Sequence, residues 1–435
     1  MGQLIGSLYL QVLHFRLIKI EMRFLKLVGF LRFLIRMIPA VFYSIAWIFR
    51  TDMRERIINK RNIMIFLFLV IAAVGIKLHN AAPDSSTEIL PDNYTYPIPA
   101  VSDVDKWWNR IDYLAETMHR TDGAWGGGYA ELMPGYKCDS THPLVRQTAH
   151  AVMGYIYAYQ TYKTPIYKQR AVDGLQWLLD EQVKAGTDKG AFLYYCNNNG
   201  TIVNGGMYET SLGGQALLYG YREFGDIKYL NAATLAADWD IKYGYIAWNH
   251  NTNAFGVSFL SEYYSTTKSQ PALDRSIYLV KSMLAKQNSA GYFDDIYNHN
   301  KIAYYHQIIT RSLIQLYSAM PVNHPDRPAV SSGMYKAINY IVTHQNADGS
   351  MWLTPTDPTP NEEEYVIDGL GLAYNELNMP VLNVLNGLTN YYMSRQDIGK
   401  DAVGIPPDIT WKEPFEQKPF IAGYMVHFVH SGSNP

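Results

Sequence analysis

The sequence predicts an all-α fold, an (α/α)6 toroid of outer and inner helices, preceded by an N-terminal membrane anchor. Two kinds of helical segment alternate from residue 101 onward, and a turn with a glycine and an aromatic residue recurs after the first kind. A basic, apolar leader occupies the first 80 residues and predicts the anchor. No segment shows sustained two-residue alternation of apolar and polar residues, so we expect no large sheet.

Charge is divided unevenly along the chain. Residues 1–80 contain twelve Lys and Arg against three Asp and Glu, whereas residues 81–435 contain twenty-five against thirty-six. A basic leader suits anionic membrane lipid, and an acidic remainder argues against binding to nucleic-acid phosphates. With 48% apolar and 17% charged residues, the chain is not intrinsically disordered.

The leader predicts export of the rest of the chain. Residues 63–76 form an unbroken apolar run of fourteen, preceded by five Lys and Arg between residues 50 and 61. We interpret residues 1–62 as a basic, amphipathic leader in the cytoplasm or at the membrane interface, and residues 63–79 as an uncleaved signal anchor. Positive charge before the anchor predicts that the rest of the chain is periplasmic, extracellular or in a secretory lumen. The alternative is a buried core helix.

After the anchor we expect a linker over residues 80–100 and a catalytic domain over residues 101–430. Export bears on the two cysteines, because thiols oxidise in such compartments. Cys138 and Cys196 fall in the loops after the first two outer segments, and we expect either a disulfide between them or two unpaired thiols. No Cys and His spacing typical of zinc and no glycine-rich nucleotide motif is present, so we expect neither a metal nor a cofactor.

The outer helices are predicted from amphipathic segments that end at the recurring turn. The turns carry aromatic residues at positions 125, 192, 248, 293 and 352, which are 67, 56, 45 and 59 residues apart. A repeat at this spacing indicates copies of one supersecondary unit. The predicted outer helices cover residues 107–119, 167–183, 229–243, 272–287, 334–345 and, more faintly, 382–393.

The inner helices are predicted from segments rich in glycine, tyrosine and small residues. A glycine inside a helix costs about 1 kcal/mol relative to alanine, so we expect close helix packing to offset it. With outer and inner helices in alternation, every long outer-to-inner loop opens on one face, beside the N-termini of the inner helices, and we expect the functional cleft there. The predicted inner helices cover residues 144–162, 207–224, 254–267, 303–320, 363–377 and 419–429.

Aromatic and polar side chains in and near these loops predict a carbohydrate-binding groove. Flat apolar rings with polar rims suit the faces of sugars, and amides and imidazoles suit their hydroxyl groups. For each residue alone the alternative is a packing role, so the prediction depends on the set. The candidate substrate-binding residues are Trp125, Arg146, Tyr208, Trp248, His250, Tyr305 and Trp352.

Carboxylates near the starts of inner helices predict hydrolytic chemistry. Asp294 and Asp295 are adjacent, and Glu209 lies at an equivalent position after the second turn. Glycoside hydrolysis uses two carboxyl groups, one that protonates the leaving oxygen and one that acts as nucleophile or activates water. The alternative for the Asp pair is an N-cap with a favourable charge at a helix start.

A second set of residues favours a different reaction. Tyr305, His306 and Arg146 are the residue types with which a polysaccharide lyase or uronate epimerase removes the proton beside a carboxylate and holds that carboxylate. The alternative for His306 is a buried histidine that is bonded within the core.

Several motifs resemble carbohydrate-active (α/α)6 toroids between residues 101 and 430. Residues 214–230, GQALLYGYREFGDIKYL, are similar to the passage from inner helix through turn to outer helix in such enzymes. The pair Asp294 and Asp295 is similar to the catalytic pair of endo-α-mannanases, which implies that Asp294 is the nucleophile and Asp295 the acid/base. Residues 249–251, NHN, resemble a motif of alginate lyases, and residues 345–352, QNADGSMW, resemble the Gln-to-Trp repeat of triterpene cyclases.

We therefore predict a membrane-anchored, exported glycoside hydrolase that cleaves a polysaccharide or oligosaccharide. The catalytic candidates are Asp294, Asp295, Glu209 and His306. Two alternatives stay open: a polysaccharide lyase or uronate C5-epimerase, and a noncatalytic glycan-binding protein of an envelope polysaccharide pathway. The expected partners are the glycan and membrane lipid, and not nucleic acid.

Overall fold

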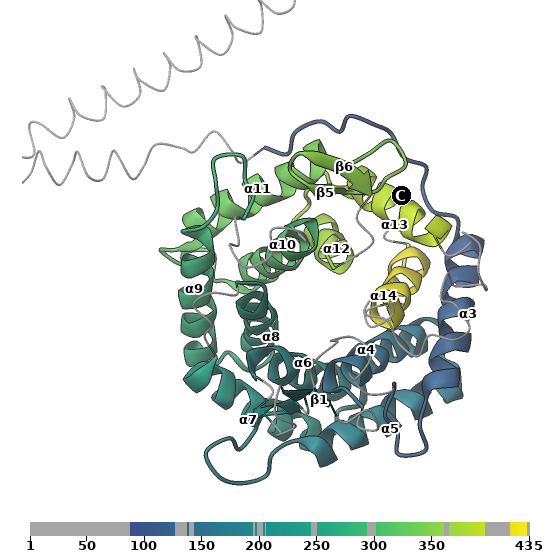
Figure 1. The fold of residues 1–435 in the computed structure, drawn as a ribbon, viewed down its shortest axis with the longest axis vertical. Coiled ribbons are helices and arrows are strands. Elements are labelled where there is room, and N and C mark those ends of the chain that lie inside the picture. Colours follow the sequence, from purple (N-terminus) through teal and green to yellow (C-terminus); the bar gives the residue numbers. More distant parts are fainter. Residues whose placement is uncertain are drawn as a thin grey trace, which may run out of the picture. The chain divides into compact units, whose positions relative to one another are not determined.

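The two kinds of segment form an outer and an inner ring of helices (Figure 1). The computed structural model describes residues 88–126, 137–138, 143–194, 196–197, 203–204, 206–244, 250–293, 302–360, 365–395 and 418–432. These residues belong to one compact unit. The predicted all-α toroid is confirmed, including its faint sixth helix pair.

Outer and inner helices alternate along the chain. The ring closes where α14 packs against both α3 and α4. The outer ring contains α3 (Val101–Met118), α5 (Pro165–Glu181), α7 (Ile227–Tyr243), α9 (Gln270–Leu284), α11 (Arg327–Thr343) and α13 (Leu382–Arg395). The inner ring contains α4 (Val145–Tyr162), α6 (Gly206–Phe224), α8 (His250–Thr267), α10 (Ile302–Ala319), α12 (Ile367–Asn375) and α14 (Lys418–His430).

The recurring turns need glycine for two reasons. Gly123, Gly190, Gly291 and Gly349 have φ between +88° and +97°, a region that other residues rarely adopt. A Cβ added to any of them would lie 2.1 to 2.6 Å from a backbone carbonyl oxygen of the next outer helix. The turns therefore fix how closely neighbouring outer helices approach.

A glutamine before three of these turns ties each turn to the next outer helix. Gln182, Gln287 and Gln345 each donate from Nε2 to the carbonyl oxygen of the turn glycine and to a second carbonyl oxygen in the following outer helix, over 2.8 to 3.1 Å. Residues 345–352 contain one of these three glutamines and the turn that follows it. Their resemblance to a cyclase repeat is therefore accounted for by the toroid architecture.

Residues 88–100, expected as part of a linker, pack along the outer ring. The Tyr96 N–H donates to Asn383 Oδ1 at 2.8 Å, and the Tyr96 hydroxyl donates to the Asn346 carbonyl oxygen at 2.6 Å. The Tyr96 side chain is buried. The described part of this segment is thus attached to the domain, which begins before residue 101.

Short two-stranded antiparallel sheets are formed by the loops that connect outer helices to the inner helices after them. In the first sheet, Cys138 and Cys196 are directly opposite each other. The strands pair as β1 (Lys137–Cys138) with β3 (Cys196–Asn197), β2 (Leu193–Tyr194) with β4 (Val203–Asn204), and β5 (Trp352–Thr354) with β6 (Asp357–Pro360).

We expect Cys138 and Cys196 to form a disulfide. Opposed residues in an antiparallel pair have Cα atoms about 4.5–5.5 Å apart, which is within the range that a disulfide spans. Peptide mapping of the unreduced, oxidised protein by mass spectrometry should recover the two cysteines as one linked peptide. Alkylation of both thiols without prior reduction would contradict this expectation.

None of the helices within the described ranges is long and apolar enough to cross a membrane. The predicted leader, residues 1–62, and the predicted anchor, residues 63–79, lie outside those ranges.

Candidate active site

Three predicted site residues meet at the N-terminal ends of inner helices. Arg146 is the second residue of α4, and Tyr208 and Glu209 are in the first turn of α6. Glu209 Oε2 accepts a hydrogen bond from the Arg146 backbone N–H at 2.9 Å, and Glu209 Oε1 is 3.4 Å from Arg146 Nε. The Arg146 guanidinium lies over the Tyr208 ring, 4.8 Å from its centroid.

The Arg146–Glu209 pair is almost completely buried. The two side chains are 5% and 1% exposed. Burial raises the pKa of Glu209, whereas the charge and the backbone N–H of Arg146 act in the opposite direction. Removing either partner would take from the other the charge that lies 3.4 Å away, so the loss of one partner is expected to destabilise the domain.

Aromatic side chains surround this pair. The Tyr208 hydroxyl is 3.2 Å from the Tyr365 hydroxyl, and the Phe255 ring lies 4.4 Å from Tyr208 and 5.5 Å from Tyr365 between centroids. Sequence analysis did not identify Tyr365. The only signal for it is its position directly after the acidic run 362–364 and just before α12.

His150 lies one turn deeper in α4. Its ring is 6.1 Å from Tyr365 and stacks on Phe420 at 5.9 Å between centroids. Burial, together with the charges of Arg311 and Arg146, lowers the pKa of His150 to about 3. This imidazole is therefore neutral at physiological pH, and it does not supply a positive charge to the site.

Three further described candidates are also at this end of the inner ring. His250 is the first residue of α8 and is buried, and Tyr305 is in the first turn of α10 and is half-buried. Trp352 begins β5, which packs against α10, and its side chain is half-buried. The positions of Tyr305 and Trp352 are compatible with the substrate-binding role that the sequence predicts, whereas His250 is buried at the start of its helix.

Trp125 does not have the position expected of a sugar-binding residue. Its side chain is fully buried, and its ring stacks on His119 at 4.3 Å between centroids. The backbone N–H of Trp125 donates to Thr148 Oγ1, which joins the turn to α4. The recurring aromatic residue is thus a packing residue of the turn, and in the fifth turn Met351, rather than Trp352, has the equivalent buried position.

His306 faces the outer ring instead of the cleft. Its side chain is fully buried, and Nε2 lies 3.0 Å from the Ala337 carbonyl oxygen of α11. Its ring is 4.7 Å from the Tyr340 ring, and burial lowers its pKa to about 4. The alternative of a buried, hydrogen-bonded histidine fits this position, and the catalytic role expected for His306 does not.

Asp294, Asp295 and Trp248 lie outside the described residues, so their roles stay predictions. The α10 helix that follows the Asp pair begins at Ile302 and belongs to the inner ring. Its N-terminus is at the same end of the inner helices as Arg146 and Glu209.

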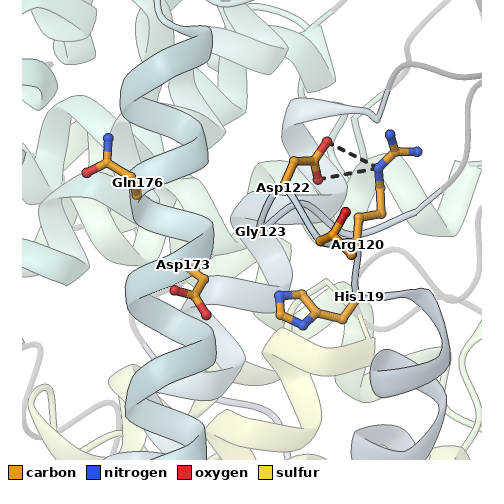
Figure 2. A pocket seen from close by; sticks show the side chains of 7 residues that line it. His119, Arg120, Asp122, Gly123, Asp173 and Gln176 are labelled. Carbon is orange, nitrogen blue, oxygen red and sulfur yellow. Dashed lines mark hydrogen bonds and ion pairs between the residues drawn. The ribbon is translucent and has the colours of Figure 1, made fainter.

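A cavity of 380 Å³ lies between the first recurring turn and α5 (Figure 2). Arg120 Nε approaches both carboxylate oxygens of Asp122 at 3.4 Å. His119 and Asp173 line the same cavity, and Asp173 belongs to α5. No residue of an inner helix lines this cavity, so we do not assign the substrate to it.

Comparisons with known proteins agree on the fold. A polysaccharide lyase is 13% identical over 77% of this chain and 99% of its own, with a TM-score of 0.55. An inactive variant of an α-1,6-mannanase of Salegentibacter sp. HEL1_6, in complex with α-1,6-mannotetrose, is 13% identical over 76% of this chain and 98% of its own, with a TM-score of 0.53. A sugar epimerase from a ruminal bacterium is 13% identical over 75% of this chain and 98% of its own, with a TM-score of 0.52.

No protein-family model matches the sequence, and neither does any curated protein. The similar structures are carbohydrate-active (α/α)6 toroids that catalyse different reactions. At this level of identity they show that the chain has the same fold, as the sequence motifs implied. The fold does not determine which reaction a protein catalyses; that depends on the residues of the site.

Proposed function

We propose that this protein is a carbohydrate-active enzyme, and within that class a glycoside hydrolase. The observation that carries the proposal is the Arg146–Glu209 pair with Tyr208 and Tyr365, held at the end of the inner ring where the long loops open. A guanidinium over a tyrosine ring, next to paired hydroxyl groups, offers both hydrogen bonds and an apolar face to a sugar.

In this proposal Asp294 and Asp295 carry out the bond cleavage. Asp294 attacks the anomeric carbon, and Asp295 first protonates the leaving oxygen and then activates the water that releases the sugar. The similar mannanase structure that holds an oligosaccharide is a variant inactivated by replacing two consecutive aspartates, which supports a role for a consecutive pair here. Glu209, Arg146 and Tyr208 would hold the sugar beside them.

Replacing Asp294 or Asp295 by asparagine should lower glycan cleavage by about 10²- to 10⁴-fold, because each change removes one nucleophile or proton donor. Release of reducing ends from a polysaccharide panel that includes α-mannan measures the activity, and circular dichroism checks the helical content. Asp122→Asn is the matched control, because Asp122 lies at the outer-ring cavity. Full activity in both pair variants would remove these residues from the mechanism.

The Tyr208–Tyr365 hydroxyl pair next to Arg146 favours a polysaccharide lyase or uronate epimerase as the second candidate. A tyrosine beside a cation suits proton removal next to a carboxylate. A lyase would produce an unsaturated uronide that absorbs ultraviolet light, and an epimerase would exchange the C5 proton with deuterium from solvent. Reducing ends released with neither signal support the hydrolase, and glycan binding without turnover supports a noncatalytic role.

We further propose that residues 63–79 anchor the protein in a membrane, with residues 80–435 exported. The support is the apolar run and the basic residues before it. Fusions after residue 100 to alkaline phosphatase, which is active only after export, should be active, whereas the same fusion with residues 63–79 deleted should not. Equal activity of both fusions would contradict the assignment.

A further inference from the structure

A second cavity lies at the other end of the inner ring. It has a volume of 520 Å³, which is enough for a small molecule. Every inner helix contributes to it from its C-terminal half or, for the short α12, along its length, so the cavity is on the axis of the ring. We call it the axial cavity; it is lined by Tyr157, Tyr219, Arg222, Glu262, Ser265, Gln315, Ser318, Asp368, Leu372, Asn375, Glu376, Tyr424 and His427.

Buried aromatic residues separate the axial cavity from the candidate active site. Phe420 is 1% exposed and lies between His150, on the side of the active site, and Tyr157 and Tyr219, which line the cavity. Tyr365, also buried, packs against His150. The axial cavity is therefore a site of its own and does not extend the proposed sugar-binding groove.

Glu262 organises one wall of the axial cavity. Its Oε1 accepts from Gln215 Nε2 at 2.7 Å and from Gln315 Nε2 at 3.0 Å, and its Oε2 accepts from Arg222 Nη1 at 3.0 Å. Arg222 also donates to Thr266 Oγ1 and to the Glu262 carbonyl oxygen. Arg222 is thus hydrogen-bonded to residues of α8, and Glu262 balances its charge.

Gln315 is left with one unused acceptor. Because a carboxylate can only accept, the contact with Glu262 fixes the amide nitrogen of Gln315 on that side. Its Oε1 is buried and has no hydrogen-bond partner among the described residues, and the residue as a whole is 6% exposed. A buried acceptor without a partner is costly, so a donor on a bound molecule would satisfy a group that the protein leaves open.

Two further carboxylates line the axial cavity. Asp368 is bonded by Arg311 Nε at 2.8 Å, and Glu376 accepts from Ser318 at 2.7 Å and is otherwise exposed. The cavity also lies at the C-terminal ends of inner helices, which carry partial negative charge. Since both nearby arginines are paired with carboxylates, the unbalanced charge is negative.

Aromatic rings line the same cavity. Tyr157, Tyr219 and Tyr424 are partly exposed there. The faces of such rings attract cations, and ammonium groups are commonly held between aromatic rings and carboxylates. One unpaired acceptor, negative charge and aromatic faces together select an organic cation over a neutral or anionic molecule.

We propose that the axial cavity binds a small organic molecule with a primary ammonium group, which donates to Gln315 Oε1 and is balanced by Glu376. Such a group could belong to a polyamine or to an amino sugar. The proposal does not depend on the glycan chemistry at the opposite end of the ring.

Isothermal titration calorimetry on the full chain in detergent tests the proposal. The cationic probes are putrescine and glucosamine, and their neutral counterparts are 1,4-butanediol and glucose. Putrescine, glucosamine or both should bind, and the neutral counterparts should bind at least about tenfold more weakly because they lack the charged donor. Binding of one cation alone identifies its class as the source of the ammonium group.

Two variants test whether the cation binds within the axial cavity. Gln315→Met removes the unused acceptor, together with the donor to Glu262, at similar volume. Glu376→Gln removes an exposed charge and keeps an amide oxygen that can accept from Ser318. Each variant should weaken binding of the cation about tenfold. Tyr208→Phe, at the opposite end of the ring, should leave its affinity unchanged. The proposal is overturned if neither cation binds, if the neutral probes bind equally well, or if both cavity variants keep the affinity of the original chain.

Discussion

Replacing Glu209 by alanine is expected to lower the free energy of unfolding by about 3–5 kcal/mol and to abolish turnover. The change leaves the Arg146 guanidinium, 5% exposed, without the carboxylate that now lies 3.4 Å from it. Chemical denaturation of the full chain measures the stability, and the polysaccharide panel measures the turnover.

A double variant separates the two effects. Arg146→Met with Glu209→Met removes both charges of this pair from the core, so most of the lost stability should return, whereas the groups that hold the sugar are absent and activity should not return. Asp112→Asn is the control, because the Arg170–Asp112 pair lies outside the inner ring and its loss should leave activity intact. A fully active double variant would show that the Arg146–Glu209 pair is only structural.

Gly190→Ala is expected to destabilise the domain more than an ordinary turn substitution. A Cβ at this position would be 2.1 Å from the Leu235 carbonyl oxygen of α7, and the backbone has φ of +97°. Strain at such a φ costs about 1–3 kcal/mol, and displacing the neighbouring outer helix adds a similar amount. Thermal and chemical denaturation measure the total loss in the free energy of unfolding.

Gly186→Ala is the matched control for this prediction. Gly186 lies in the same loop with a φ of +82°, but nothing is within 4 Å of its added Cβ. Gly186→Ala should lower the free energy of unfolding by the cost of the backbone strain alone. The difference in this free energy between the two variants therefore gives the cost of the close approach. Equal losses of stability would mean that the contact between the turn and α7 does not limit the fold.

Much of the toroid could be predicted from the sequence because its repeat leaves a local signal. The turn glycines and the apolar residues after them recur in every clear copy. The helical spacing of apolar residues predicts the helices between the turns. What the repeat could not reveal is which aromatic residues face inward: Trp125 marks a turn as clearly as Trp352 does, yet it is fully buried under that turn. Burial depends on the neighbouring helices, which a local pattern does not specify.

The candidate site was only partly predictable for a similar reason. Glu209 was predicted from its position near an inner-helix start and Arg146 from its residue type, but their pairing joins residues 63 positions apart and follows from ring geometry. Tyr365 has no motif of its own. His306 and Arg146 were grouped by residue type, whereas α10 turns His306 toward α11 and so removes it from the group.

The position of a bound glycan decides whether Arg146, Tyr208 and the Asp294–Asp295 pair form the active site. A crystal structure of the protein with an oligosaccharide taken from the most active polysaccharide of the panel is the direct measurement. We expect a sugar ring within hydrogen-bond distance of Arg146 or Tyr208, with the Asp294 carboxyl group facing the anomeric carbon and the Asp295 carboxyl group next to the glycosidic oxygen. An oligosaccharide bound only at the outer-ring cavity or only in the axial cavity would contradict the assignment of the active site.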